Sequence, residues 1–394
     1  MAITAIKQLS VATAVSVSLS LLSISEACAY TFTKIADSRS SFNSFSSFPR
    51  PSINNQGTVA FAADLDAGGN GIFIGNGGAI TTITDTNGPF SFVYSDFSIN
   101  DKGTVVFAAD LDAGGNGIFI NSGGVTTTIV DSSGSFATVF TPSINNEGTV
   151  AFQAFLDTGG EGIFTSSGGL VATIAETSDL FVRFFGPSIN DRGTVAFGTL
   201  LALSSEGDGI FTSSDGSIAN IANDSGSFND FGALYNAFPS INNEGTVAFG
   251  AIQTKGTGIF IGNGGVITSI AITSISNPFF FSGFDFIPSI NNSGTVAFLA
   301  NLSTQPGAVG IFTLSGGVID KVIATGDRLF GSTVTNLKFF REGLNDAGQV
   351  AFYASLADGT QGIFRADPES VSEPASALSP LRVGFLGLGL RQKR

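Results

Sequence analysis

The stretch PSINNQGTVAF, residues 51–61, decides the fold of this chain. Its centre, NNQG, predicts a tight hairpin turn, because Asn hydrogen-bonds to its own backbone and Gly57 adopts positive φ without strain. In the residues that follow, the bulky Val59 and Phe61 alternate with the small Ala60. Alternation at period two predicts a β-strand with one bulky and one flat face, which suits sheets that stack face to face.

The pattern N-x-x-G-x-x-A-F recurs along the chain, with Val in place of Ala in the second copy. Successive copies begin 46, 45, 45, 52, 49 and 54 residues apart, and a Gly-Ile-Phe follows each of them. The seven copies begin at Asn54, Asn100, Asn145, Asn190, Asn242, Asn291 and Asn345. Such a period indicates a protein built from one repeated supersecondary unit.

Each repeat contains four predicted short strands. In the first repeat, the strand at 58–62 is followed by a Gly-rich connection at 64–70, the segment GIF at 71–73, a turn at 76–78 and a strand at 80–84. Four antiparallel strands per repeat are typical of a propeller blade, so the sequence predicts an all-β, seven-bladed β-propeller. A one-sided β-solenoid is the rival, although its coils are usually shorter and parallel and lack the recurring hairpin signal.

The two ends of the repeat region complement each other. Residues 30–37, YTFTKIAD, match the fourth-strand pattern TTTIVD at 126–131, whereas the last repeat stops after the GIF at 362–364. The chain therefore begins with the strand that its last repeat lacks. We expect the strand at 31–36 to pair with the incomplete seventh repeat. This pairing would close the ring and remove exposed strand edges.

Composition excludes several kinds of chemistry. The 394 residues include no His, one Cys and no Trp. A Ser-His-Asp triad, a Cys-His dyad and an imidazole-ligated metal are therefore absent, and carboxylates, hydroxyls and backbone groups remain. The formal net charge of −14 argues against a nucleic-acid partner and against anionic lipid surfaces.

The first 29 residues have the pattern of a secretory signal peptide. Lys7 precedes an apolar run from residue 9 to about 24, and Ala27 and Ala29 suit signal peptidase cleavage after Ala29. Cleavage there removes the single Cys28, so the mature chain would hold no disulfide. We therefore expect an exported protein, extracellular or at the cell surface of a bacterium, with three parts: a signal peptide at 1–29, the propeller at 30–368 and a tail at 369–394.

The repeats resemble those of a bacterial family described as choice-of-anchor tandem-repeat proteins containing NxxGxxAF, over residues 30 to about 366. The tail resembles a PEP-CTERM sorting signal, with Glu373-Pro374, an apolar segment at 383–390 and a basic end at 391–394. The resemblance implies a secreted or surface-held repeat protein, with a sorting protease acting at the tail and delivery to the envelope or exopolysaccharide. The apolar segment is too short to span a bilayer. A signal that had lost its function would leave the protein secreted and soluble.

The segments that most resemble a metal-binding site are the repeats of DLDAGGN at 64–70 and 110–116. Alternating oxygen ligands with glycines between them could wrap Ca²⁺. The calcium candidates are Asp64, Asp66, Asn70, Asp110, Asp112 and Asn116. A hairpin loop whose Asp and Asn side chains cap their own backbone explains the same residues. No catalytic residue and no other cofactor is predicted, because no pair of carboxylates is singled out by the sequence.

Together these features predict an exported structural or binding repeat module of the cell envelope or exopolysaccharide matrix, without catalysis. Extracellular polysaccharide or an envelope protein is the expected partner. The alternative is a carboxylate-dependent hydrolase or lyase acting on extracellular polysaccharide. The observation that discriminates the binding module from the enzyme is whether Asp or Glu side chains from several blades converge at a mouth of the channel. Function is expected to enter at the longer inserts, 200–208, 229–237 and 324–340, because variable loops on a rigid scaffold carry binding.

Overall fold

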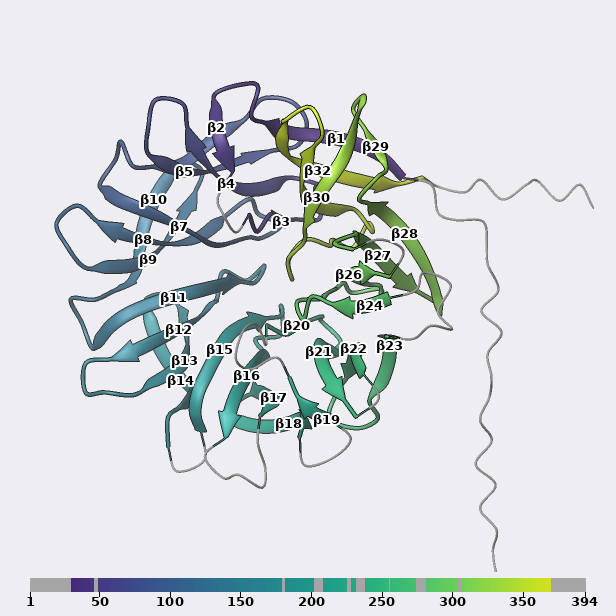
Figure 1. Ribbon diagram of the computed structural model, residues 1–394. Coiled ribbons are helices and arrows are strands. Elements are labelled where there is room, and N and C mark those ends of the chain that lie inside the picture. The colour runs from purple at the N-terminus through teal and green to yellow at the C-terminus, as the bar shows by residue number, and fades with distance from the viewer. Residues whose placement is uncertain are drawn as a thin grey trace, which may run out of the picture.

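In the computed structural model of this protein, the described residues form β-strands, joined by turns and loops, around a central channel (Figure 1). The residues that the structure describes are 30–45, 49–178, 181–201, 208–224, 228–231, 238–254, 256–273, 281–303 and 306–369. They form seven antiparallel sheets, which confirms the prediction of an all-β, seven-bladed propeller over the solenoid. The predicted signal peptide and most of the tail lie outside the described residues. Within the described ranges, no helix is long and apolar enough to cross a membrane.

The second, third and fourth blades each have four strands that pair in chain order from the channel outward. The second blade contains β7 (Phe90–Ile99), β8 (Val105–Leu111), β9 (Asn116–Ser122) and β10 (Val125–Asp131). The third contains β11 (Phe136–Ile144), β12 (Val150–Leu156), β13 (Glu161–Ser167) and β14 (Leu170–Glu176). The fourth contains β15 (Phe181–Ile189), β16 (Val195–Leu201), β17 (Gly209–Ser214) and β18 (Ser217–Asn223).

In the first, fifth and sixth blades the innermost strand is split into two short segments that pair with the same neighbour. The first blade contains β2 (Phe42–Phe45), β3 (Ser52–Ile53), β4 (Val59–Leu65), β5 (Asn70–Gly75) and β6 (Thr81–Asp85). The fifth contains β19 (Phe228–Asp230), β20 (Ser240–Ile241), β21 (Val247–Gln253), β22 (Gly256–Gly262) and β23 (Thr268–Ile272). The sixth contains β24 (Phe281–Phe284), β25 (Ser289–Ile290), β26 (Val296–Leu302), β27 (Val309–Ser315) and β28 (Val318–Ala324).

The seventh blade is completed by the first strand of the chain. Its sheet has the order β1 (Tyr30–Asp37), β32 (Gln361–Pro368), β31 (Val350–Leu356), β30 (Ser332–Lys338) and β29 (Arg328–Leu329). Strand β1 pairs antiparallel with β32, from Tyr30 opposite Pro368 to Asp37 opposite Gly362. The predicted closure of the ring is therefore confirmed, and the strands at the two ends of the propeller lie side by side (Figure 1).

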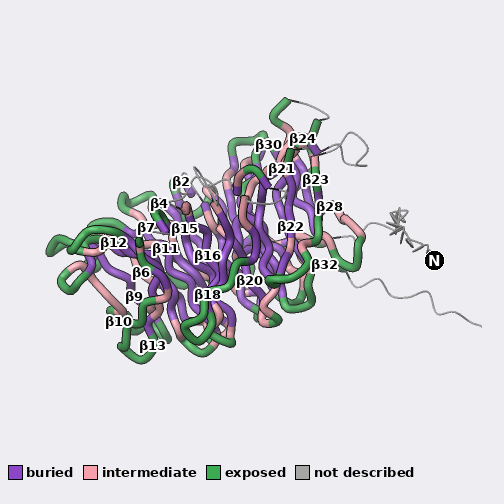
Figure 2. Tube along the Cα trace, turned by 90° about the horizontal axis from the view of Figure 1, so that it is seen from below, coloured by how far each residue is buried: buried purple, intermediate pink, exposed green. Residues whose placement is uncertain are grey.

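The core lies between neighbouring blades and follows from the alternation within the motif. One cluster contains the small Ala60 and Ala62 of the first blade together with Phe107 and Phe119 of the second. The seven motif Phe side chains are each no more than 1% exposed. Figure 2 shows the buried residues inside the sheets and the exposed ones at the turns and the rim. Burying each of these Phe side chains stabilises the fold by roughly 1.5–3 kcal/mol. The same packing of a bulky face on a flat face recurs in all seven blades.

Closure makes a prediction about deletion of residues 30–37. The deletion leaves β32 without its outer neighbour and exposes the cluster that Phe32 helps to cover. We expect the melting temperature to fall by at least about 5 °C and the protein to aggregate. Removal of residues 370–394, which lie beyond β32, is the matched control. If the shortened protein melted as a monomer at the parent temperature, the closure of the ring by β1 would be wrong.

Candidate functional site

The channel is lined by alternate residues of the seven inner strands. Counting from the motif Asn as position 0, the residues at positions 0 and −2 line it as an Asn layer and a Ser layer. Residues at position −4 contact one another between blades: the Arg50 side chain pairs with Asp96, and the Arg341 side chain donates to the backbone carbonyl of Gly186. The period of two is that of a β-strand, so each inner strand contributes one residue to each layer.

The seven motif Asn side chains form a closed ring of hydrogen bonds. Each Nδ2 donates to the backbone carbonyl of the motif Asn in the next blade, at 2.9–3.1 Å, and the seventh donates back to the first. These side chains are buried. The members are Asn54, Asn100, Asn145, Asn190, Asn242, Asn291 and Asn345. Every blade is therefore bonded to both neighbours through the same residue.

The motif Asn also holds the turn of its own blade. In every blade its Oδ1 accepts a hydrogen bond from the backbone N–H four residues later, at 2.8–3.0 Å. The motif Gly donates its N–H to the Asn carbonyl, and its φ lies between 73° and 85°. A side chain would strain that backbone, which explains the Gly. The sequence predicted this turn, but it did not predict the bonds between blades.

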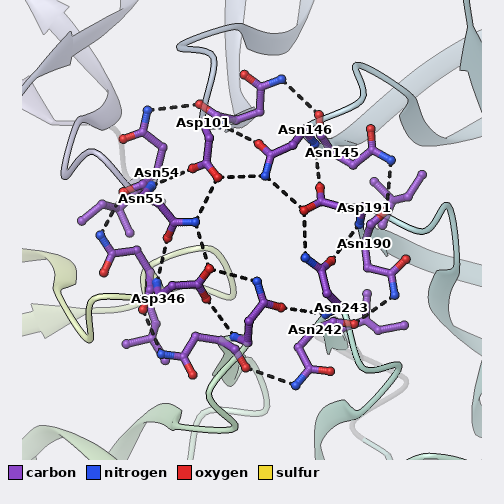
Figure 3. A pocket seen from close by; sticks show the side chains of 18 of the residues that line it. Asn54, Asn55, Asp101, Asn145, Asn146, Asn190, Asp191, Asn242, Asn243 and Asp346 are labelled. Carbon is purple, nitrogen blue, oxygen red and sulfur yellow. Dashed lines mark hydrogen bonds between the residues drawn. The ribbon is translucent and has the colours of Figure 1, made fainter.

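A second ring lies at the residue after the motif Asn (Figure 3). Each backbone N–H at this position donates to the Oδ1 of the corresponding residue in the next blade, at 2.7–2.9 Å. A hollow of about 160 Å³ lies at this mouth of the channel. The members are Asn55, Asp101, Asn146, Asp191, Asn243, Asn292 and Asp346, none of which the sequence singled out.

Three carboxylates from different blades thus converge at one mouth of the channel. Asp101, Asp191 and Asp346 each accept two further hydrogen bonds at Oδ2, at 2.8–3.1 Å, from the amides of flanking Asn residues. Both oxygens of each carboxylate are therefore engaged in the ring. The arrangement suits acceptors that fix the turns.

The Ser layer is broken in the seventh blade. Six blades carry Ser at position −2, and the hydroxyl accepts the backbone N–H of the following blade in four contacts such as Ile99 to Ser52, at 3.2–3.5 Å. The seventh blade carries Gly343, where a Cβ would lie 2.7 Å from the ring of Phe339 and 2.9 Å from a carbonyl oxygen. Here Ile53 donates instead to the carbonyl of Glu342, at 2.9 Å.

At this break two ionisable side chains, Arg341 and Glu342, line the channel. Arg341 is 3% exposed and donates from Nη1 to the carbonyl of Gly186 in the fourth blade, at 2.7 Å. Glu342 accepts the hydroxyl of Ser52 at 3.1 Å. Burial raises the pKa of Glu342, although Arg341 and the neighbouring Ser hydroxyls oppose the shift. A cavity of about 150 Å³, lined by the Ser layer, adjoins both side chains.

Position −4 is the layer of the channel whose residue type varies most from blade to blade. It consists of Arg50, Asp96, Thr141, Gly186, Phe238, Ile287 and Arg341. The Arg50 guanidinium lies 4.6 Å from the ring centre of Phe340, and that of Arg341 lies 5.4 Å from that of Phe238. Guanidinium groups on aromatic faces gain cation–π attraction. Position −4 together with Phe340 is called the variable layer below, and it is the candidate site.

A pocket of about 170 Å³ beside the variable layer is lined by Arg50, Asp285, Lys338 and Phe340. Burial raises the pKa of Asp285, and Lys338 and Arg50 oppose the shift. Lys338 and Phe340 belong to the predicted insert at 324–340. Residues 202–207 and 232–237 of the other two inserts lie outside the described residues.

Two of the calcium candidates, Asp66 and Asp112, lie in loops between the second and third strands of the first two blades, and the other four lie at the ends of those strands. Asp64 accepts the hydroxyl of Ser44, and both carboxylate oxygens of Asp110 lie 3.0 Å from the hydroxyl of Tyr94. The Asn116 side chain bonds to both backbone groups of Val139 in the third blade: it donates to the carbonyl at 2.8 Å and accepts the N–H at 3.3 Å. Asn70 does the same at Val93 of the second blade.

Asp66 and Asp112 are exposed, and the described part of the chain has no group of three or more His, Cys, Asp or Glu that could hold a metal ion. Four of the six candidates thus have protein partners, and calcium binding stays a prediction.

A family described as a family of unknown function (DUF7453) matches residues 29–378. The chain belongs to this family. No curated protein sequence matches the chain.

Several solved structures share the fold at low sequence identity. An oligogalacturonate lyase from Vibrio parahaemolyticus is 13% identical, with a TM-score of 0.55, and the match covers 86% of this chain and 98% of the lyase. An oligogalacturonate lyase in complex with manganese is 10% identical, with a TM-score of 0.52 and coverage of 86% and 97%. An acylaminoacyl peptidase from Pyrococcus horikoshii is 13% identical, with a TM-score of 0.51, and covers 81% of this chain but only 50% of the peptidase. At these identities the likeness supports the propeller fold alone.

The raised pKa of Glu342 predicts how stability depends on pH. The folded state holds the proton at pH values where the unfolded chain releases it, so its stabilising effect is full at low pH and is lost as pH rises through the folded pKa. We expect the melting temperature to fall as pH rises above the ordinary range of a Glu carboxyl, and Glu342→Gln to flatten that fall.

Asp208 provides the control for this experiment. Burial, with repulsion from Asp230 and Asp224, raises its pKa to about 6, so Asp208→Asn should remove a separate part of the same trend. A Glu342→Gln profile that ran parallel to the wild-type profile would show that Glu342 does not carry the linkage.

Proposed function

We propose that this protein is an exported binding module of the cell envelope or exopolysaccharide matrix, and that it binds extracellular polysaccharide at the variable layer. The observation that carries the proposal is the loss of repetition at this one level of the channel. The Asn ring and the second ring use Asn or Asp in all seven blades, and the Ser layer uses Ser in six. The variable layer instead combines two guanidinium groups, a carboxylate and two aromatic rings.

The chemistry of the variable layer suits a polar ligand with apolar faces. Aromatic rings pack against the flat faces of sugar rings, while charged side chains supply charge-assisted hydrogen bonds that fix the orientation. Arg50 and Asp96 are about one fifth exposed, at 21% and 22%, and they are paired with each other. They are therefore accessible from solvent and already ordered, which lowers the entropy lost on binding.

Export and attachment rest on the two ends of the chain. The signal peptide pattern at 1–29 supports secretion, and the PEP-CTERM-like tail at 369–394 supports recognition by a sorting protease. Both ends suit a protein that works outside the cell. The acidic net charge of −14 supports a partner other than nucleic acid.

A polysaccharide lyase or hydrolase is the second candidate function. The observation that favours it is the fold shared with oligogalacturonate lyases. The three carboxylates that converge at one mouth do not add support, because amide groups occupy both oxygens of each. Binding without turnover is the function that the geometry supports best.

A binding assay on a panel of immobilised bacterial exopolysaccharides tests the proposal. We expect the exported protein to be retained by at least one polysaccharide, and the double variant Arg50→Ala/Asp96→Ala to bind at least about tenfold more weakly, since it loses charge-assisted contacts. Arg192→Ala is the matched control, because Arg192 is 63% exposed at the opposite mouth of the channel.

Two results would contradict the proposal. Equal binding by the double variant and the control would place the site elsewhere on the molecule. Release of unsaturated sugar products, detected by ultraviolet absorbance, would establish the lyase instead.

A further inference from the structure

A groove lies between the second and third blades, whose inner strands β7 and β11 are neighbours in the ring (Figure 1). Its volume of about 460 Å³ falls within the range of about 300–1,000 Å³ that is usual for small-molecule sites. Tyr94 lines the groove two residues before Asp96 of the variable layer, and Thr138 lines it three residues before Thr141. The groove therefore lies beside the variable layer, at the mouth of the channel opposite to the second ring.

An exposed aromatic ring stands beside the groove. The ring of Phe92 packs edge-on against that of Tyr94, with 5.1 Å between the ring centres, and Phe92 is 48% exposed. Phe92 pairs with Asp110 in the sheet, and the residues at the same register in the other six blades are polar or Gly. They are Ser44, Thr138, Arg183, Asp230, Gly283 and Asn336. Phe92 thus offers an apolar surface that a ligand can bury, and Tyr94 holds it in place.

The polar groups of the groove are held in a fixed arrangement. The hydroxyl of Tyr94 lies 3.0 Å from both carboxylate oxygens of Asp110 and donates to them. Burial raises the pKa of Tyr94, and the carboxylates of Asp110 and Asp96 raise it further, so the hydroxyl keeps its proton. Because one proton serves two oxygens, the carboxylate of Asp110 retains acceptor sites for a ligand. The hydroxyls of Ser91 and Thr138 line the same groove.

We propose that this groove binds a neutral sugar unit of the polysaccharide, with the apolar face of the sugar ring on Phe92 and two neighbouring hydroxyls on the carboxylate of Asp110. This inference rests on the proposed function and adds a second contact point together with the chemical class of the sugar there. The two oxygens of a carboxylate can each accept a hydroxyl proton, and such charge-assisted hydrogen bonds are strong. The hydroxyl oxygen of Tyr94 can accept a third hydrogen bond from the sugar.

The charge of the groove favours a neutral sugar over an acidic one. Among the described residues, those that line the groove include one carboxylate, Asp110, and no Lys or Arg. A carboxylate on the sugar would meet the charge of Asp110 without a cation beside it, and like charges a few ångströms apart repel. Sugar hydroxyls and the apolar face of a sugar ring carry no such penalty.

Ligand-observed NMR titration of the exported protein with pairs of monosaccharides tests the proposal. The probes are glucose, galactose and mannose, each paired with the sodium salt of its own uronic acid, so that the two members of a pair differ in the carboxylate alone. We expect at least one of the neutral hexoses to bind, and its uronate to bind at least about fivefold more weakly because Asp110 repels it. Absence of hexose binding, or equal binding of a hexose and its uronate, would overturn the inference.

Two variants place the sugar. Phe92→Ala removes the exposed ring and Asp110→Asn removes the charge, and each should weaken hexose binding at least about fivefold. Asp110→Asn should also bring the hexose and its uronate to within about twofold of each other, a change that a merely structural role of Asp110 would not produce.

Matched controls come from the same repeat pattern. Val125→Ala removes a side chain of the second blade that is 66% exposed on the outer strand, and Asp64→Asn changes the same position of the first blade, where the hydroxyl of Ser44 is the partner. Both controls should leave hexose binding unchanged. Circular dichroism and melting curves establish that the variants fold. If Asp110→Asn fails to fold, Phe92→Ala decides the question.

The outcomes separate this inference from the proposed function. Hexose binding that Phe92→Ala leaves unchanged would overturn the inference and place the sugar elsewhere on the molecule. If retention on polysaccharide still depended on Arg50 and Asp96 in that case, the proposed function would stand without the groove. If a hexose bound at Phe92 but no polysaccharide was retained, the groove would stand as a site for a free sugar and the proposed function would fall.

Discussion

The structure depends on one interaction, the hydrogen bond from the side-chain amide of each motif Asn to the backbone carbonyl of the next. Asn is suited to this position because its short side chain carries both an acceptor and a donor. The acceptor closes the turn within a blade, and the donor reaches the neighbouring blade. Asp would keep only the acceptor. The bond from Asn345 to Asn54 completes the ring, so the blades form one closed network.

The closed ring explains why the variable layer can differ between blades. The Asn ring, the second ring and the Phe clusters already fix the inner strands against one another, so the residues at position −4 are not needed to define the fold. The seventh blade departs furthest from the repeated pattern. Gly343 lets the backbone turn where a Ser would clash, and Arg341 and Glu342 then fill the channel that the other blades leave to hydroxyl groups.

The fold and the number of blades could be predicted because periodicity reports backbone pairing and face alternation directly. The closure by residues 30–37 was predictable for the same reason. The bonds between Asn residues were not, because the motif Asn has a sufficient local explanation in its own turn. The second ring was hidden because Asn and Asp alternate irregularly there. One signal could have revealed the candidate site: Glu342-Gly343 stands where five of the other repeats carry Pro-Ser. Contacts such as Arg341 to Gly186 join residues 155 positions apart, which no repeat pattern reports.

The most direct measurement is the free energy of unfolding of Asn145→Asp, compared with Asn76→Asp in an exposed turn at the rim of the first blade. The first change keeps the acceptor in the turn and removes the donor to Asn190. If the Asn ring holds the blades together, Asn145→Asp should lose at least about 1–3 kcal/mol of stability, because the carbonyl of Asn190 loses its partner between blades and a carboxylate is buried. Asn76→Asp should change it by less than about 0.5 kcal/mol. Equal stability of the two variants would contradict the account.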